Sequence, residues 1–176
     1  MQAIPIGMNM RDMIGLAPTG SGKSAAFLLP LISFLLKMPP ITQNLVEDGP
    51  YALIMAPTRE LAIQIDKEFQ KLTRDTALRS VVIVGGKSAE EQGSKISRGV
   101  EVIIGTPGRI EDSLNRRTLV LNQSYWLILD EADKMIDFNL EDSVNFIIDS
   151  IPQHLHKSNE EKEVLEQEAA MIQGKQ

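Results

Sequence analysis

The sequence predicts an α/β fold in which helices cover both faces of a parallel β-sheet. Short apolar segments rich in Ile, Val and Leu predict strands that are buried on both faces, at residues 12–17, 51–56, 79–86, 100–106 and 125–130. Segments with helical spacing lie between them, at residues 22–37, 58–73, 89–97 and 107–115. Because each connection between parallel strands crosses a face of the sheet, this alternation predicts helices on both sides.

Two of the predicted helices carry recognisable start signals. Thr58 is a plausible N-cap, and Pro107 suits the first turn of a helix. In the helix that follows Thr58, apolar residues spaced four, four and three apart form one stripe: Leu61, Ile65, Phe69 and Leu72. That stripe predicts the face that packs against the sheet.

Length and composition indicate a single domain. The 176 residues are 43% apolar, enough for one substantial core, which we expect to span residues 1–153. Residues 38–50 contain three prolines and predict a loop or insertion. From residue 154 onward the chain is charged and poor in apolar residues, which predicts a tail or insertion, either a fraying helix or disordered.

Composition also excludes several classes of protein. The chain has no cysteine and two histidines, which excludes a disulfide framework and leaves little for a zinc site. The longest apolar run, residues 27–36, is too short to span a membrane, and the N-terminus does not resemble a signal peptide. We therefore expect an intracellular protein with no membrane partner.

The negative charge is concentrated in the last part of the sequence. Residues 1–129 hold 14 Lys and Arg against 12 Asp and Glu, a balance of +2. Residues 130–176 hold 4 against 12, a balance of −8, which accounts for the net charge of −6. The acidity therefore does not argue against an anionic partner for a surface built from the first two thirds of the chain.

The stretch "APTGSGKS", residues 17–24, predicts a phosphate-binding loop between a strand and a helix. Gly20 and Gly22 leave room for backbone N–H groups to converge on phosphates at the start of the following helix. Lys23 then reaches the β- and γ-phosphates of a nucleotide, and the Ser24 hydroxyl binds Mg²⁺. The general pattern begins with glycine, and here Ala17 stands in that position; Ser21 completes the loop.

A magnesium site of this type needs a carboxylate at the end of another buried strand. Asp130 follows the segment "YWLIL" and can orient the metal ion, and Glu131 beside it can polarise the attacking water. Lys23, Asp130 and Glu131 are thus the candidate catalytic residues, with ATP and Mg²⁺ as the predicted ligands.

In its ordered motifs the chain resembles the DEAD-box RNA helicases. These motifs are "APTGSGKS" (17–24), "PTREL" (57–61), "GG" (85–86), "TPGR" (106–109) and "DEAD" (130–133), and each follows a predicted strand. The resemblance implies the N-terminal RecA-like domain of a P-loop NTPase that binds ATP and RNA. It adds Thr19 to the ATP site and assigns Asp133 a link to a later motif.

The resemblance also implies an RNA-binding surface. Its candidate residues are Pro57, Thr58, Arg59, Gly85, Gly86, Thr106, Gly108 and Arg109. Glycines and helix N-termini let backbone amides approach phosphates, and arginine adds charge-assisted hydrogen bonds, so such a surface reads the RNA backbone rather than its bases.

The chain also departs from the family pattern. The family's adenine-contacting glutamine would precede Met1, Ser24 replaces the more usual threonine, and neither the Ser-Ala-Thr motif nor the second RecA-like domain is present. We therefore expect a fragment that is nearly inactive without that second domain. "DEADKMID" and the Glu-rich stretch after "SIPQ" resemble the spliceosomal branch of the family, which implies spliceosomal proteins as partners and a nuclear location.

Two other functions are compatible with parts of the sequence. Another P-loop NTPase, such as a small-molecule kinase, would share the phosphate loop but would not require "PTREL" and "TPGR" at two strand ends. A non-catalytic RecA-like interaction module would have no need for Lys23, Ser24, Asp130 and Glu131 together.

Overall fold

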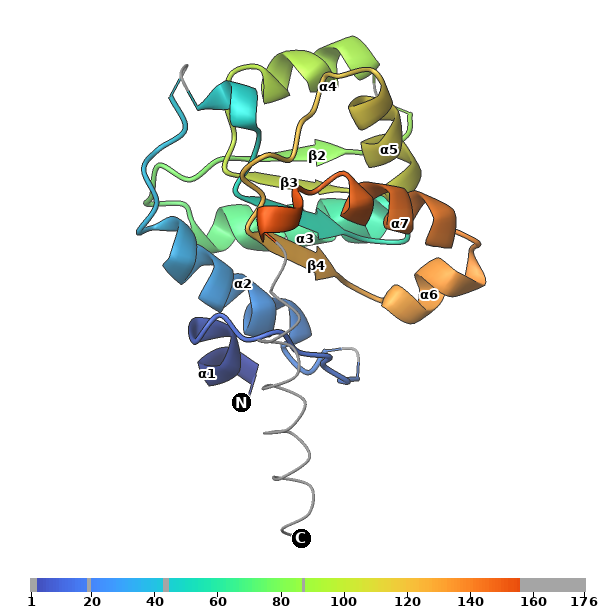
Figure 1. The fold of residues 1–176 in the computed structure, drawn as a ribbon. Helices are drawn as coiled ribbons and strands as arrows, with labels where there is room; N and C mark the ends of the chain where they lie inside the picture. Colours follow the sequence, from blue (N-terminus) through green and yellow to red (C-terminus); the bar gives the residue numbers. More distant parts are fainter. Residues whose placement is uncertain (1–2, 19, 43–44, 87, 156–176) are drawn as a thin grey trace, which may run out of the picture.

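The computed structural model describes residues 3–18, 20–42, 45–86 and 88–155. These residues form a four-stranded parallel sheet flanked by helices (Figure 1). In spatial order the strands are β2 (Ser80–Ile83), β3 (Val102–Gly105), β1 (Ala52–Met55) and β4 (Trp126–Leu129). The predicted α/β fold with a parallel sheet is confirmed.

Helices cover both faces of the sheet, and each face has its own apolar core. One core joins α2 (Lys23–Leu35) and α3 (Arg59–Leu72) to alternate strand residues such as Ile54 and Ile104. The other core joins α4 (Ala89–Ile96), α5 (Pro107–Asn115), α6 (Ala132–Asp137) and α7 (Glu141–Asp149) to Leu53 and Ile103. Because neighbouring residues of a strand point to opposite faces, each buried strand contributes to both cores.

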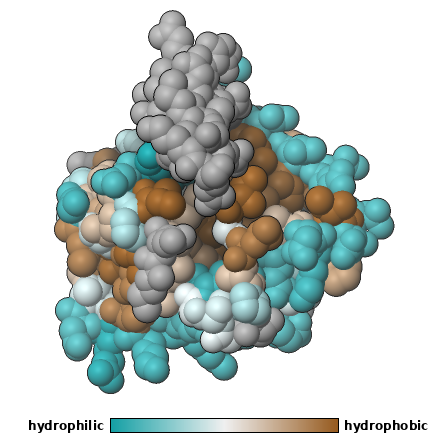
Figure 2. All heavy atoms as spheres, turned by 90° about the horizontal axis from the view of Figure 1, so that it is seen from below, coloured by the Kyte–Doolittle hydropathy of each residue, from teal (hydrophilic) through white to brown (hydrophobic). Residues whose placement is uncertain are grey.

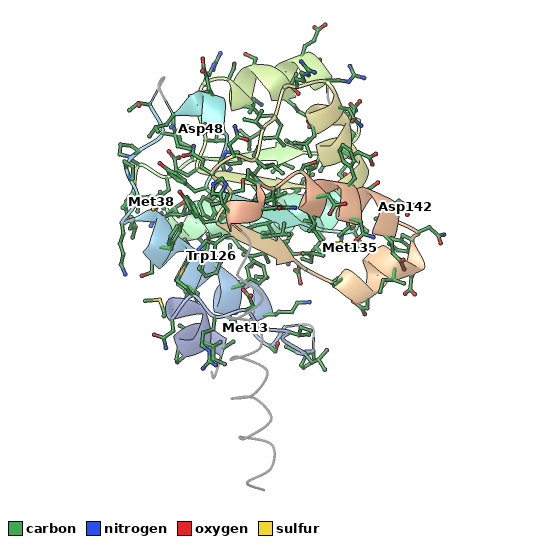
Figure 3. The ribbon with its side chains drawn as sticks, viewed as in Figure 1. Met13, Met38, Asp48, Trp126, Met135 and Asp142 are labelled. Atoms are coloured by element: carbon green, nitrogen blue, oxygen red, sulfur yellow. The ribbon has the colours of Figure 1, made fainter. Side chains whose placement is uncertain are left out.

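Two residues labelled in Figure 3 mark the two cores near β4. Trp126 on β4 packs against the first core, with its ring 6.0 Å from that of Phe34 on α2. Met135 on α6 is buried in the second core.

Burial differs between the central and outer strands. All residues of β1 and β3 are buried, as predicted, whereas all four residues of β4 are only partly buried and those of β2 alternate. The outer strands have a neighbouring strand on one side only. The prediction of burial on both faces is therefore wrong for β2 and β4.

The strand predicted at residues 12–17 is also wrong. That segment has no regular secondary structure, and Ile14 and Leu16 are each 97% exposed. Figure 2 looks onto the end of the molecule that carries α1 and shows apolar surface there. An apolar segment becomes a strand only where its backbone finds a hydrogen-bonding neighbour, and residues 12–17 pair with none of the four strands.

The predicted helices begin and end within two residues of their expected bounds. Thr58 caps α3 by accepting a hydrogen bond from the Leu61 N–H at 3.3 Å, and Pro107 occupies the first turn of α5, both as predicted. The sequence reading did not identify α1 (Ala3–Met8), α6 or α7. Helix α1 packs on α2, where Gly7 allows close approach to Pro30.

The segment 38–50 is mostly irregular, as predicted, and contains the short 3₁₀ helix Val46–Asp48. A second 3₁₀ helix, Gln153–Leu155, ends the described chain, so most of the predicted tail lies outside the described residues. Within the described ranges, none of the helices is both long and apolar enough to cross a membrane.

Candidate nucleotide and RNA site

Apart from the phosphate loop, which precedes α2, the candidate site residues follow the carboxyl ends of the four strands. Met55 of β1 lies opposite Leu129 of β4 and Gly105 of β3, and Gly105 lies opposite Ile83 of β2. The segments after these residues therefore emerge side by side at one edge of the sheet. In α/β sheets this carboxyl edge is where ligands bind.

The phosphate loop leads into α2 and is open to a ligand. Gly20 and Gly22 have φ angles of +79° and +85°, a left-handed conformation that favours glycine, and no atom lies within 4 Å of a Cβ placed on either one. Gly22 is the N-cap of α2 and Lys23 is its first residue. Because the N-cap residue is a glycine, it has no side chain to cap the first N–H groups of α2, which can therefore meet an anion. Thr19 lies outside the described residues.

Lys23 and Asp130 form an ion pair across the site. Lys23 Nζ lies 2.8 Å from Asp130 Oδ1, and the Asp130 side chain is only 3% exposed whereas that of Lys23 is 32% exposed. The Asp130 N–H donates to the Met55 carbonyl at 3.0 Å, which extends the pairing of β4 with β1 by one residue. The carboxylate is therefore fixed at the end of β4, facing the first turn of α2.

Glu131 occupies an unusual backbone conformation beside this pair. Its φ of +54° lies in the left-handed region, which is unfavourable for a residue with a side chain, and it is the N-cap of α6. Lys134 Nζ lies 2.7 Å from Glu131 Oε2, and this hydrogen bond and the charge of Glu131 raise the pKa of Lys134 above its ordinary value. Asp133 is exposed in the first turn of α6.

The "PTREL" segment at the start of α3 contacts the "GG" segment after β2. Pro57 is buried, Thr58 caps the helix, and Arg59 Nη1 donates to the Gly85 carbonyl at 2.8 Å. Gly86 has a φ of +76°. The contact of Arg59 with the Gly85–Gly86 segment thus brings together two separate motifs that the resemblance placed in one RNA-binding set.

The "TPGR" segment forms the start of α5. Thr106 is its N-cap, Gly108 is exposed, and Arg109 Nη1 donates to Asp112 Oδ2 at 3.1 Å. Arg109 also lines a cavity of about 250 Å³ between α4 and α5, to which Arg116 contributes. The buried Arg109 Nε has no hydrogen-bond partner among the described residues.

The candidate residues thus divide into two groups along one sheet edge. The ATP and Mg²⁺ candidates follow β4 or belong to the phosphate loop, whereas the RNA candidates follow β2, β3 and β1. Sequence reasoning missed Lys134, although its spacing three residues after Glu131 on a helix is a known ion-pair signal. It also missed Gln92, a buried residue of α4 next to the "GG" segment.

Comparison with known proteins reveals close relatives. A helicase from Oryza sativa subsp. japonica, "DEAD-box ATP-dependent RNA helicase 21", is 50% identical over 165 residues, which is 93% of this chain and 22% of that protein. "Pre-mRNA-splicing ATP-dependent RNA helicase prp28" from Sclerotinia sclerotiorum is 53% identical over 150 residues, 85% of this chain and 18% of that protein. The chain therefore spans about a fifth of the length of these curated relatives.

Solved structures share the fold. The yeast DEAD-box splicing factor Prp28 matches with a TM-score of 0.75 and 46% identity, over 80% of this chain and 32% of that chain. The RNA helicase Prp28 from Chaetomium thermophilum, bound to ADP, matches with a TM-score of 0.74 and 48% identity, over 82% of this chain and 35% of that chain. The predicted RecA-like architecture is confirmed. Since residues 1–165 also match the model of the "DEAD/DEAH box helicase" family, the chain belongs to that family.

Proposed function

We propose that this chain is the ATP-binding part of an ATP-dependent RNA helicase. The observation that carries the proposal is the contact between Lys23 of the phosphate loop and the buried Asp130 at the end of β4. A cation for phosphates and a carboxylate for a metal ion meet there at one helix N-terminus, which is the arrangement that nucleoside triphosphate binding needs.

The loop residues fit a triphosphate. Gly20 and Gly22 leave the space above the start of α2 clear, and the N–H groups of Gly22, Lys23 and Ser24 lie where the helix dipole favours negative charge. Lys23 exchanges its contact with Asp130 for contacts to phosphate oxygens. Ala17, Thr19 and Ser21 complete this loop by sequence.

Ser24 and Asp130 are the proposed ligands of Mg²⁺. Both offer the oxygen atoms that this ion prefers, Ser24 from the first turn of α2 and Asp130 from the end of β4. When bound, the ion neutralises charge on the phosphates. Asp130 is held by its backbone pairing to β1, so it can orient such an ion without reorganising.

Glu131 is the proposed group that orients and polarises the attacking water. Its backbone conformation directs it away from the continuation of β4, and its carboxylate is held by Lys134 at 2.7 Å. For Glu131 to accept a hydrogen bond from water, its carboxylate must share or leave this contact. Asp133, exposed on the same helix, is proposed to connect the site to a later motif.

The RNA is proposed to lie along the ends of β2, β3 and β1. The Gly85–Gly86 turn, in which Gly86 is exposed, and the N-terminal turns of α3 and α5 offer backbone N–H groups, and Arg59 and Arg109 add positive charge. Such contacts address phosphates, so we expect little sequence preference and a strong dependence on salt.

Hydrolysis and duplex opening are proposed to require a second RecA-like domain in the full-length protein. Arginines from a partner domain can contribute roughly 10³ to 10⁵ in rate to related phosphoryl transfers, so the chain alone should be nearly inactive. Several relatives are named as pre-mRNA-splicing helicases. We extend this to a role in pre-mRNA splicing, with spliceosomal proteins as partners and a nuclear location.

RNA-stimulated ATP hydrolysis by the full-length protein tests the proposal. Arg109→Ala should lower the RNA affinity and the RNA stimulation, whereas Arg116→Ala, which removes another arginine paired with Asp112, should leave both near the wild-type values. ATP hydrolysis that is unaffected by RNA in the wild-type protein would overturn the RNA role and favour another P-loop enzyme. Loss of hydrolysis in Asp130→Asn with RNA affinity retained would support the division of the two sites.

A further inference from the structure

The Gly85–Gly86 turn lies at the outer edge of the sheet and has little support from neighbouring strands. It follows β2, which among the described strands pairs with β3 alone, and that pairing ends where the Thr106 N–H donates to the Ile83 carbonyl at 3.2 Å. The next residue, Val84, is fully buried, so its N–H must be satisfied inside the protein.

Gln92 of α4 satisfies that group. Its Oε1 accepts the Val84 N–H at 2.9 Å, and its Nε2 donates to the Ser88 carbonyl at 3.2 Å. Gln92 is only 4% exposed. Because Val84 precedes the Gly85–Gly86 turn and Ser88 follows it, one buried amide fastens both ends of the turn.

A second side chain holds the same turn from the opposite helix. Arg59 at the start of α3 donates to the Gly85 carbonyl at 2.8 Å. That bond is exposed to solvent, whereas the bond from Val84 to Gln92 is buried. Leaving a buried donor without a partner costs the full desolvation free energy of that group, whereas an exposed donor can bond to water. The bond to Gln92 is therefore a stronger restraint on the turn than the bond from Arg59.

We infer that Gln92 is a positioning residue for RNA binding: it fixes the conformation in which the Gly85–Gly86 turn presents its backbone to RNA phosphates. This inference rests on the proposed function, which places those glycines on the RNA surface. Gln92 itself need not touch RNA. Its loss should weaken RNA binding through the turn and leave the Lys23 and Asp130 side of the sheet edge unchanged.

Gln123 provides a matched control. It is also a buried glutamine, 9% exposed, and its Nε2 donates to the carbonyls of Leu45 and Gly49 at 3.0 and 2.6 Å. Gln123 precedes β4 and fastens the segment 38–50, which leads into β1. It therefore lies at the opposite end of β4 from Asp130. Gln92→Ala and Gln123→Ala therefore both remove a buried amide that makes at least two hydrogen bonds to the backbone.

The experiment measures the affinities of the full-length protein for single-stranded RNA and for Mg·ATP in both variants. We expect Gln92→Ala to weaken RNA binding about tenfold with an unchanged affinity for Mg·ATP, because a buried donor is left unpaired at the turn. Gln123→Ala should change neither affinity. Gln92→Glu, which keeps an acceptor for the Val84 N–H, should recover part of the lost RNA affinity.

Equal RNA affinities of the Gln92→Ala and Gln123→Ala variants, with Arg109→Ala still weakening RNA binding, would overturn the inference alone. Unchanged RNA affinity in Arg109→Ala and Gly86→Ala would instead overturn the RNA surface on which the inference rests. Amide hydrogen exchange gives an independent readout. Val84 should lose protection in Gln92→Ala, and retained protection there would contradict the positioning role.

Discussion

Lys23 Nζ and Asp130 Oδ1 lie 2.8 Å apart, and the two side chains differ tenfold in exposure, at 32% and 3%. The cation proposed for the phosphates thus serves as the charge partner of the carboxylate proposed for the metal ion. Lys23 provides the counter-charge that the buried carboxylate of Asp130 requires. The ion pair therefore holds the phosphate loop and the end of β4 together.

The asymmetry in burial predicts unequal effects of removing either partner. Lys23→Ala leaves a buried carboxylate unpaired and should lower the free energy of unfolding by about 1–3 kcal/mol. Asp130→Asn should cost less, because the partly exposed Lys23 ammonium can regain water. Urea unfolding of the two variants at pH 7 measures both values. A larger loss for Asp130→Asn would contradict this description of the pair.

The left-handed backbone conformation of Glu131 predicts that this residue lowers the free energy of unfolding while serving ATP hydrolysis. A residue with a side chain at φ +54° is strained by about 1 kcal/mol, which glycine relieves. Glu131→Gly should therefore raise the free energy of unfolding by about 1 kcal/mol. The same variant should abolish ATP hydrolysis by the full-length protein.

Arg117 supplies the control for that variant. It is exposed and has a φ of +56°, but it follows α5, away from the phosphate loop. Arg117→Gly should raise stability similarly and leave hydrolysis unchanged. If Glu131→Gly hydrolyses ATP at the wild-type rate, Glu131 does not act on the attacking water.

The two glycines after β2 should respond differently to substitution. A Cβ on Gly86 would collide with the guanidinium of Arg59 and would also require a strained φ of +76°, whereas a Cβ on Gly85 meets no atom within 4 Å. Gly86→Ala should lower the free energy of unfolding by about 1–2 kcal/mol and weaken RNA binding. Gly85→Ala should change stability by less than about 0.5 kcal/mol. Thermal or urea unfolding, together with RNA titration, distinguishes the two positions.

Tyr51 predicts a loss of stability at alkaline pH. Burial raises its pKa above the ordinary 10.0, and the nearby Glu101 and Tyr125 add to the rise. The folded protein keeps the phenol protonated where the unfolded chain ionises, so stability should fall as the pH rises through and above about 10. Tyr51→Phe should remove that part of the decline.

At neutral pH the same variant should be slightly less stable. Tyr51 donates a hydrogen bond to the Pro39 carbonyl at 3.0 Å, and losing such a bond costs about 1 kcal/mol. Urea unfolding at pH 8 and pH 10.5 separates the two effects. A decline with pH that is identical in the wild-type protein and Tyr51→Phe would show that Tyr51 does not contribute to it.

Much of the fold could be predicted because local patterns and tertiary packing agree. Of the predicted stripe, Ile65 and Phe69 are buried in the first core and Leu61 packs against it, whereas Leu72 is 44% exposed. Thr58 and Pro107 begin their helices where the sequence indicates. The prediction of a strand at residues 12–17 is wrong because a strand forms only beside a partner strand, and the composition of a segment does not show whether it has one. Helix α7 could have been found from the spacing of Val144, Ile147 and Ile148.

Some residues of the candidate site could also be predicted from the sequence, and others could not. Lys23 and Asp130 could be paired from sequence, because a phosphate loop that binds Mg²⁺ together with a nucleotide needs a carboxylate at the end of a strand. Gln92 could not be identified, since an uncharged residue in an amphipathic helix gives no sign that it is buried or that it bonds to Val84. Its role depends on a contact between β2 and α4 that only the folded chain shows.

The affinity of residues 1–176 for Mg·ATP, measured by calorimetry in the wild type, Lys23→Ala and Lys95→Ala, tests the central claim most directly. Lys95 pairs with Glu91 on the surface of α4 and serves as the control for removing a lysine from an ion pair. We predict that Lys23→Ala weakens binding by about tenfold or more, as expected for a lost bond to a charged group, and that Lys95→Ala leaves it unchanged. Equal affinities of the wild type and Lys23→Ala would contradict the proposal that Lys23 and Asp130 form the nucleotide site.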